Sequence, residues 1–153
     1  MTETNAAKPI WKTPFSIERA NQLSEGCVNA RLGIELIEAG PDYVVARMPV
    51  DERTKQPAGI LHGGASVLLA ETLASFAGAF CVDPKTQSVV GQEINANHLR
   101  SATGGFVTGT ARPLHLGRRS HVWEIHITND DGKLVCVSRM TLAVIDRPST
   151  DRY

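Results

Sequence analysis

Residues 56–80 read QPAGILHGGASVLLAETLASFAGAF, and this stretch decides the expected fold. From position 65 to position 81 the chain carries small, hydroxyl and apolar side chains, with a single carboxylate at Glu71. A run that is apolar nearly all round is typical of a helix enclosed at the centre of a domain. The glycine pair before the run and the segment VDPKT after it predict where this helix begins and ends.

Four segments of alternating polarity follow the helix, with turns between them, and predict an antiparallel meander. In the last of them, KLVCVSRMTLAVID (133–146), every second residue from Cys136 to Val144 is expected to face one side of a sheet. Upstream, residues 34–50 predict a hairpin, and Ser16 predicts the N-cap of a short helix. The expected fold class is therefore α+β, with one curved antiparallel sheet wrapped around one long central helix.

The length and composition indicate a single domain spanning 1–153, with flexible ends at 1–14 and 147–153. Sixteen basic and sixteen acidic side chains balance, which argues against nucleic acid or an anionic membrane as a partner. We expect no membrane span and no signal peptide, because no apolar run has the required length or position. Three cysteines without metal or disulfide spacing predict reduced, buried thiols in a cytoplasmic protein: Cys27, Cys81 and Cys136.

The carboxylate of Glu71 has two possible roles. Burying a charge is unfavourable unless the charge is paired or functional, so Glu71 is either a structural acid at an interface or edge, or a desolvated reactive group. Ser75 follows one helical turn later on the same face. At the start of the helix, the amide of Gly63 and the positive end of the helix dipole favour a developing oxyanion.

The spacing of these two groups constrains any site that uses both. Gly63 and Glu71 are eight positions apart, which is about 12 Å along a helix. An oxyanion donor and a base must both come within about 3 Å of one carbonyl group. One helix cannot supply both, whereas two antiparallel copies related by a two-fold axis can. If Glu71 is catalytic, we expect it to act at a dimer interface, opposite Gly63 of the partner subunit.

Three stretches resemble the signature of hotdog-fold thioesterases: VDERTKQPAGILHGGASVLLAETLASFAG (50–78), VVGQEINANHLRSA (89–102) and ARPLHLGRRSHVWEI (111–125). The resemblance extends from Gly33 to Ile145. It is to the subgroup that contains 1,4-dihydroxy-2-naphthoyl-CoA thioesterase and the proofreading thioesterase of enterobactin synthesis. It implies hydrolysis of an aromatic acyl-CoA, best matched by the dihydroxynaphthoyl ester of menaquinone-type or phylloquinone-type pathways. It also implies no cofactor beyond the CoA of the substrate, active sites at a homodimer interface, and a homotetramer of two such dimers.

The resemblance also implies a role for each site residue. Glu71 is the nucleophile or general base, and the Gly63 amide polarises the thioester carbonyl. His62 and Gln56 orient the thioester and the lytic water, while Ser75 holds water or Glu71. The implied CoA contacts include arginines, whose guanidinium groups suit phosphate, although GRRSH alone also fits a solvated turn. These contacts are Gly91, His98, Leu99, Arg100, Ser101, His115, Leu116, Gly117, Arg118, Arg119 and Ser120.

Other substrates and functions remain open at this point. Ala58 stands where the family usually has a bulkier residue, which predicts a wider or reshaped acyl pocket. A broad-range or proofreading enzyme would act on other CoA or carrier-protein thioesters, and a non-catalytic acyl-CoA-binding module would bind without turnover. The hotdog fold also hosts dehydratases, but here the acid occupies the thioesterase position. We expect no metal site, because His121 and His126, five apart on a strand, point to opposite faces.

Overall fold

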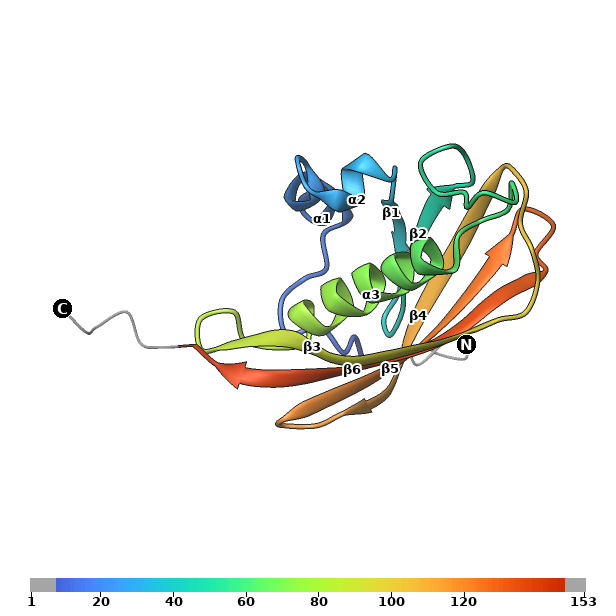
Figure 1. Ribbon diagram of the computed structural model, residues 1–153. Coiled ribbons are helices and arrows are strands. Elements are labelled where there is room, and N and C mark those ends of the chain that lie inside the picture. Colours follow the sequence, from blue (N-terminus) through green and yellow to red (C-terminus); the bar gives the residue numbers. More distant parts are fainter. Residues whose placement is uncertain (1–7, 148–153) are drawn as a thin grey trace, which may run out of the picture.

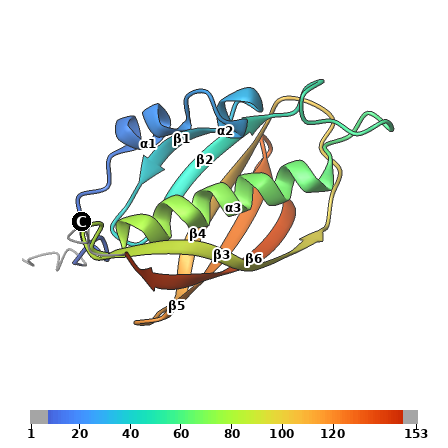
Figure 2. The same cartoon turned by 60° about the vertical axis from the view of Figure 1, so that its left-hand side comes forward.

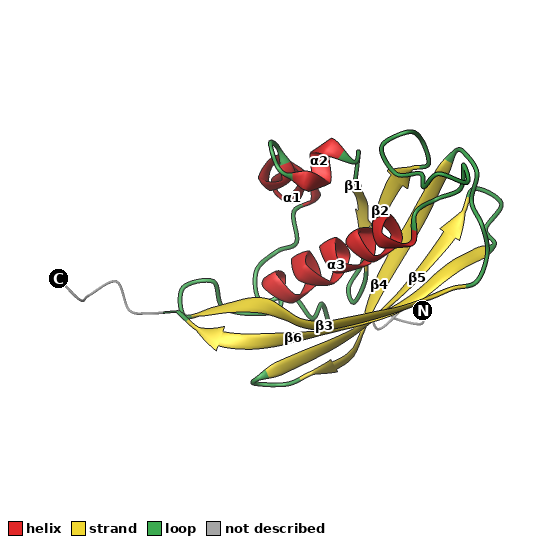
Figure 3. Cartoon of the chain, in the orientation of Figure 1, coloured by secondary structure: helices red, strands yellow, loops and turns green. Residues whose placement is uncertain are grey.

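The computed structural model describes residues 8–147, which fold into one curved sheet and three helices. The long helix α3 lies in the concave face of the sheet, and the two short N-terminal helices lie beyond it (Figures 1 and 2). Colouring by secondary structure shows the strands crossing beneath α3 as one layer (Figure 3). The elements are α1 (Ile17–Ser24), α2 (Val28–Arg31), β1 (Glu35–Ala39), β2 (Val44–Pro49), α3 (Gly63–Phe80), β3 (Gln87–His98), β4 (Phe106–Leu116), β5 (Ser120–Asn129) and β6 (Leu134–Asp146).

The sheet has the strand order β1-β2-β4-β5-β6-β3, and every neighbouring pair is antiparallel. The chain leaves α3 into β3, which is an edge strand paired with the C-terminal strand β6. The register between these strands shifts between Gly91 and Glu93, which marks a bulge near the middle of the edge strand. This arrangement places one face of α3 beside the edge of the sheet.

The core forms where α3 presses on the inner face of the sheet. Leu69 and Leu73 are fully buried, and a Cβ at Gly109 of β4 would come within 2.7 Å of Leu73 Cδ1. The helix therefore packs closely against β4 because that position has no side chain. Along β6, the expected alternation is confirmed, since Cys136, Ser138, Met140, Leu142 and Val144 are all buried. The α+β hotdog fold predicted from the sequence is confirmed.

The central helix begins two residues earlier than the apolar pattern predicts and ends one residue earlier. His62 is its N-cap, and His62 Nδ1 accepts a hydrogen bond of 2.8 Å from the backbone N–H of Gly64. The side-chain cap brings both glycines into the helix. By length and composition α3 could also span a membrane, but nine of its 18 residues are buried, as in a core helix.

Residues 8–14 pack against the body of the domain, which differs from the flexibility expected for 1–14. The backbone N–H of Lys12 donates to the Phe80 carbonyl at the end of α3 (2.8 Å), and Trp11 Nε1 donates to the Gly40 carbonyl (2.9 Å). The Trp11 and Phe15 rings also pack together, with centroids 5.2 Å apart. This aromatic and hydrogen-bonded anchoring was not apparent from the polar composition. The flexibility predicted for 1–7 and 148–153 lies outside the described residues.

The prediction that all three cysteines are buried is wrong for one of them. Cys81 and Cys136 are buried, and burial raises the pKa of the Cys81 thiol to about 12 and that of Cys136 above its usual range. Cys27 is exposed because it lies at the junction of α1 and α2, outside the core. All three are free thiols.

Candidate active site

The carboxylate of Glu71 lies against the edge strand of the sheet. A Cβ at Gly91 of β3 would stand 3.2 Å from Glu71 Oε1 and 2.9 Å from Met140 Cε, so any side chain at Gly91 would crowd the carboxylate. Gly91 therefore provides room for Glu71, and its contact with CoA stays a prediction. The close approach of strand and acid depends on the missing side chain.

Glu71 is exposed in the single chain, so its desolvation at a dimer interface stays a prediction. The apolar composition of α3 suggested burial all round. The sheet covers only one side of the helix, and Glu71 projects toward the edge strand, beyond the enclosed face. One chain thus supplies the apolar surroundings of the acid without covering it.

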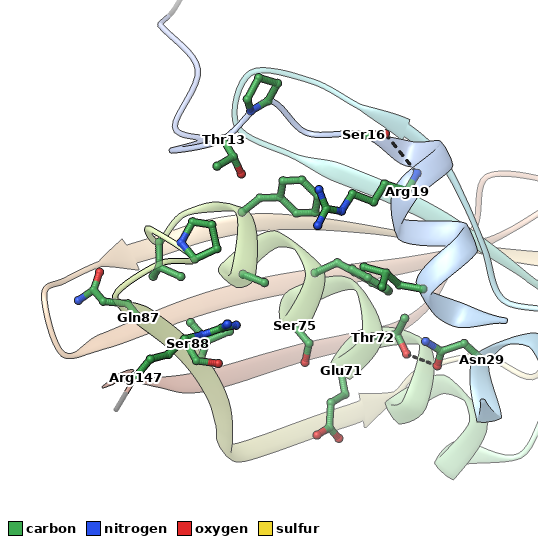
Figure 4. Close-up of a pocket in the computed structure, with 18 of the residues that line it drawn as sticks. Thr13, Ser16, Arg19, Asn29, Glu71, Thr72, Ser75, Gln87, Ser88 and Arg147 are labelled. Carbon is green, nitrogen blue, oxygen red and sulfur yellow. Dashed lines mark hydrogen bonds between the residues drawn. The ribbon is translucent and has the colours of Figure 1, made fainter. Parts of the chain in front are cut away.

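A cavity of about 820 Å³ opens beside Glu71, between α3 and the N-terminal helices. Its size falls in the range of small-molecule sites, and apolar groups dominate its walls. Figure 4 shows Glu71 and Ser75 on α3, with Thr72 hydrogen-bonded across to Asn29 of α2. We call this cavity the Glu71 pocket. One face of α3 forms its floor, through Leu68, Glu71, Thr72, Ser75, Phe76, Ala79 and Phe80.

The start of α3 forms a second, smaller cavity of about 350 Å³. Gly63 lies in its wall, and within residues 8–147 the Gly63 N–H has no hydrogen-bond acceptor. The ring of His98 lies over Gly63, where an added Cβ would stand 2.8 Å from His98 Nε2. The first amide of the helix therefore faces a cavity with its N–H available, as an oxyanion donor requires. We call this cavity the amide pocket.

Several predicted site residues do gather at the amide pocket. Gln56 joins Gly63 there, and Gln56 Oε1 accepts a hydrogen bond of 2.7 Å from the Ala58 N–H, which fixes the loop before α3. His62 caps the helix through Nδ1 and is exposed. Ala58 lines neither of these two pockets, and its effect on the acyl pocket stays a prediction. The remaining predicted residues at this pocket are His98, Leu99, Arg100 and Ser101.

The Glu71 pocket and the amide pocket share none of their lining residues. The eight-residue separation on α3 thus appears in the structure as two separate cavities. Glu71 is placed beside an apolar cavity, and the available amide of Gly63 is placed elsewhere. A single chain does not bring these two groups to one carbonyl carbon.

The predicted CoA contacts also fall into two groups that one chain does not bring together. On β6, Cys136 pairs with His98 and Ala143 pairs with Ser120. These partners are seven residues apart, or roughly 23 Å along a strand. Positions 98–101 and 115–120 therefore lie toward opposite ends of the sheet. The phosphates of one CoA molecule do not contact both groups of the same subunit.

The arginines of the two groups have different surroundings. Arg100 Nη1 donates to the Leu134 carbonyl (2.7 Å), and Arg119 Nη1 forms an exposed ion pair with Asp146 (3.1 Å). No carboxylate in the described part of the chain pairs with Arg118. The Gly117 N–H donates to the Ser120 carbonyl (2.8 Å), which closes the tight turn that presents both arginines beside His115 and Leu116. Within residues 8–147, no three His, Cys, Asp or Glu side chains are grouped as metal ligands.

Sequence reasoning missed the buried side of His121, which lies beneath α3. A Cβ at Gly78 would stand 3.6 Å from His121 Nδ1, and this nitrogen has no hydrogen-bond partner in the described residues. Burial, and secondarily the nearby His115, lower the pKa of His121. The strand alternation placed His121 and His126 on opposite faces, which is confirmed, but it did not say which of the two was inside.

Lowering the pH should destabilise the fold through His121. The pKa of His121 is lower in the folded than in the unfolded chain, so the unfolded chain binds its proton more readily. The contribution of the neutral imidazole to the free energy of unfolding is therefore complete above about pH 6.5 and is lost as the pH falls below that value. Because only one proton is involved, the free energy of unfolding changes through His121 by at most about 1.4 kcal/mol per pH unit. Urea unfolding at fixed protein concentration between pH 7.5 and 5 should show a smaller loss for His121→Leu than for wild type. Equal losses in both proteins would contradict this prediction.

Comparison with known proteins identifies the family. The model of the Thioesterase superfamily matches residues 58–136. The chain is 51% identical over 136 residues to the 1,4-dihydroxy-2-naphthoyl-CoA hydrolase of Escherichia coli, covering 89% of this chain and 99% of that protein. It is 48% identical to a proofreading thioesterase of Cronobacter turicensis, with 89% and 98% covered. A mutant thioesterase from Pseudomonas aeruginosa superposes with a TM-score of 0.89 at 45% identity, with 90% and 99% covered. Together with the architecture described above, these matches show that the chain belongs to the thioesterase superfamily and is a hotdog-fold thioester hydrolase.

Proposed function

We propose that the chain hydrolyses an aromatic acyl-CoA, with 1,4-dihydroxy-2-naphthoyl-CoA as the best candidate. The observation that carries this proposal is the Glu71 carboxylate at the wall of a mostly apolar pocket of about 820 Å³. A pocket of this size and character suits a ring system, and an acid at its wall suits attack on a carbonyl group. The relative named for the dihydroxynaphthoyl ester supports the choice of acyl group.

In the proposed reaction Glu71 accepts a proton from water while the water oxygen bonds to the thioester carbonyl carbon. The resulting oxyanion accepts a hydrogen bond from the Gly63 amide at the positive end of α3. The carbon–sulfur bond then breaks, and the proton passes from Glu71 to the CoA thiolate, releasing the acid and CoA. Alternatively, the Glu71 carboxylate attacks the carbonyl carbon, the carbon–sulfur bond breaks and CoA leaves as a thiolate that takes a proton from water. Water then cleaves the mixed anhydride, which releases the acid and restores Glu71. Gln56, His62 and Ser75 are proposed to orient the water and the thioester.

The active site is proposed to form between two subunits, with Glu71 from one and the amide pocket from its partner. This arrangement is supported by the separation of the two pockets and by the two distant groups of CoA contacts. Two such dimers form the proposed tetramer. A cytoplasmic location and the absence of a metal or redox cofactor stay predictions.

The second candidate is a broad-range or proofreading thioesterase. Two relatives with 51% and 48% identity differ in name and activity, so overall similarity does not select the acyl group or its carrier. A screen of aromatic and aliphatic CoA and carrier-protein thioesters, followed by release of free thiol, tests the proposal. Fastest turnover of the dihydroxynaphthoyl ester supports it, and a preference for carrier-protein thioesters favours the second candidate. Binding of acyl-CoA without any turnover would identify a non-catalytic module.

Mixing two inactive variants should restore activity if the site is shared between subunits. A heterodimer of Glu71→Gln and Gly63→Pro contains one intact site, made from the wild-type half of each subunit. After unfolding and refolding a 1:1 mixture, we expect about a quarter of the wild-type activity, because half of the dimers carry one of two sites. Refolding each variant alone is the control. A mixture no more active than either variant would rule out the shared site.

A further inference from the structure

The N-terminal helix α1 forms the wall of the Glu71 pocket that faces α3. Ser16, Arg19 and Leu23 line the pocket, and their spacing places them on one face of α1. α1 runs antiparallel to α3, because Phe15 packs on Phe80 at one end (ring centroids 4.2 Å apart). At the other end, Thr72 Oγ1 donates to Asn29 Oδ1 (3.0 Å). Arg19 lies between these two contacts in sequence, on the α1 side of the pocket that Glu71 also lines.

Side-chain hydrogen bonds hold this wall in place. Asn21 Nδ2 donates to the Leu36 carbonyl, and Asn21 Oδ1 accepts from the Leu36 N–H, both at 2.9 Å. One side chain thus occupies both backbone groups of Leu36 in the edge strand β1, as a neighbouring strand would. Since Asn21 is two residues from Arg19, the guanidinium of Arg19 extends from a fixed stretch of backbone. Preorganisation of this kind reduces the entropy lost when a ligand binds.

Arg19 has no charged partner in the described part of the chain. Arg47, Arg53, Arg112 and Arg119 each pair with a carboxylate, whereas only the backbone N–H of Arg19 is hydrogen-bonded, to Ser16 Oγ. A guanidinium carries five N–H donors. In Figure 4 the Arg19 side chain extends over the pocket from α1, on the side opposite the Glu71 carboxylate. Among residues 8–147, Glu71 is the only acid that lines this pocket, and it points toward β3.

The walls between these two groups are apolar. Leu68, Phe76 and Val89 line the pocket that the acid and the arginine share. Phe76 lies five residues beyond Glu71, or about 7.5 Å along the helix, which is comparable with the length of one or two fused rings. An aromatic acyl group whose carbonyl lies at Glu71 has room to extend along these walls, in the same pocket that Arg19 lines. A guanidinium at that place binds a carboxylate in bidentate fashion or donates to a phenolic oxygen.

We propose that Arg19 determines acyl specificity, by binding an acidic substituent on the aromatic ring at the end remote from the thioester. This inference rests on the proposed function, since it assumes that the acyl group occupies the Glu71 pocket. The substrate class is thereby narrowed to arenecarbonyl thioesters with a remote carboxylate or phenolic hydroxyl.

The test compares kcat/KM for benzoyl-CoA, 4-hydroxybenzoyl-CoA and 4-carboxybenzoyl-CoA in wild type, Arg19→Met and Arg19→Lys. Arg19→Met should lower the ratio of substituted to unsubstituted ester roughly 10-fold or more, the size expected for a hydrogen bond to a charged group. Activity on benzoyl-CoA should fall much less than activity on the two substituted esters, and Arg19→Lys should recover part of the ratio. Arg147→Met is the matched control, because Arg147 lines the same pocket from the end of β6. An unchanged ratio in Arg19→Met, or an equal change in Arg147→Met, would overturn the proposal.

A binding measurement separates this inference from the proposed function. Calorimetry gives the dissociation constants of non-hydrolysable thioether analogues of the same three esters. The ratio of these constants between substituted and unsubstituted analogues measures the same preference without turnover. Loss of the preference in Arg19→Met supports the role of Arg19 whether or not the esters are hydrolysed. If hydrolysis requires Glu71 but the preference for substituted esters is the same in wild type and Arg19→Met, the proposed function is retained. Only the inference about Arg19 is then contradicted.

Discussion

Replacing Glu71 with glutamine should lower kcat for thioester hydrolysis by about 10² to 10⁴-fold, the contribution typical of a general base. The amide has nearly the same shape as the carboxylate but neither accepts a proton nor attacks a carbonyl carbon. It also keeps the fit beside Gly91, where the acid has little room. KM should change little, because the pocket walls that hold the acyl group are intact. Steady-state kinetics on the best ester from the thiol-release screen provide the measurement.

The matched control for Glu71→Gln is Glu124→Gln. Glu124 lies on β5 beside His126, in a weak exposed pair at 3.5 Å, and lines neither pocket. Its replacement should leave kcat unchanged. If Glu71→Gln retains wild-type kcat while Glu124→Gln does too, Glu71 is a structural acid and the proposed mechanism fails. A single turnover in ¹⁸O-labelled water then separates the two mechanisms in the wild type, because only direct attack by Glu71 places the label in the protein.

Replacing Gly63 with proline should lower kcat by about 10² to 10³-fold, the loss typical of one oxyanion donor. Proline removes the N–H that the first residue of α3 presents at the amide pocket. The first position of a helix tolerates proline, and the extended backbone of His62 (φ −70°, ψ 131°) suits a residue that precedes it. The change therefore removes the donor with little disturbance of α3.

Gly63→Ala is the control for this variant. Alanine keeps the N–H but adds the Cβ that meets the His98 ring, so it reports the steric effect alone. We expect Gly63→Ala to be much more active than Gly63→Pro, with both variants giving the same helical content by circular dichroism. Equal losses in both would show that crowding of His98, rather than loss of the amide, limits the rate.

The sequence predicted the fold well because its strongest signals were local. An apolar run around the whole of α3 and the period-two pattern of β6 each report burial within one element. The boundaries of α3 were less accurate, since the cap made by His62 depends on a side-chain contact that no hydrophobic pattern records. The exposure of Cys27 and the anchoring of residues 8–14 depended on contacts distant in sequence, which explains why they were missed.

The site was predicted in part, for the same reason. Glu71 and Gly63 were apparent from residue type and from the helical spacing between them. The environment of Glu71 was not, because composition shows what is apolar but not which face of a helix the sheet covers. Gly91 was assigned to CoA by resemblance, whereas its place beside Glu71 follows from the position of α3 over the edge strand. Arg19 and Asn29 carried no motif at all, and only the folding of α1 and α2 against α3 brings them to the pocket.

By itself the sequence determined the long helix and the strands, the family, and the distance along α3 between an acid and a helix-start amide, but it did not predict α2. These depend on the order and spacing of residues, which the chain carries in any conformation. Only the tertiary structure decided that the acid and the amide lie in separate cavities, and that the predicted CoA contacts occupy opposite ends of the sheet. Such placements arise from strand order and helix packing, where residues far apart in the chain meet, and no local pattern encodes them.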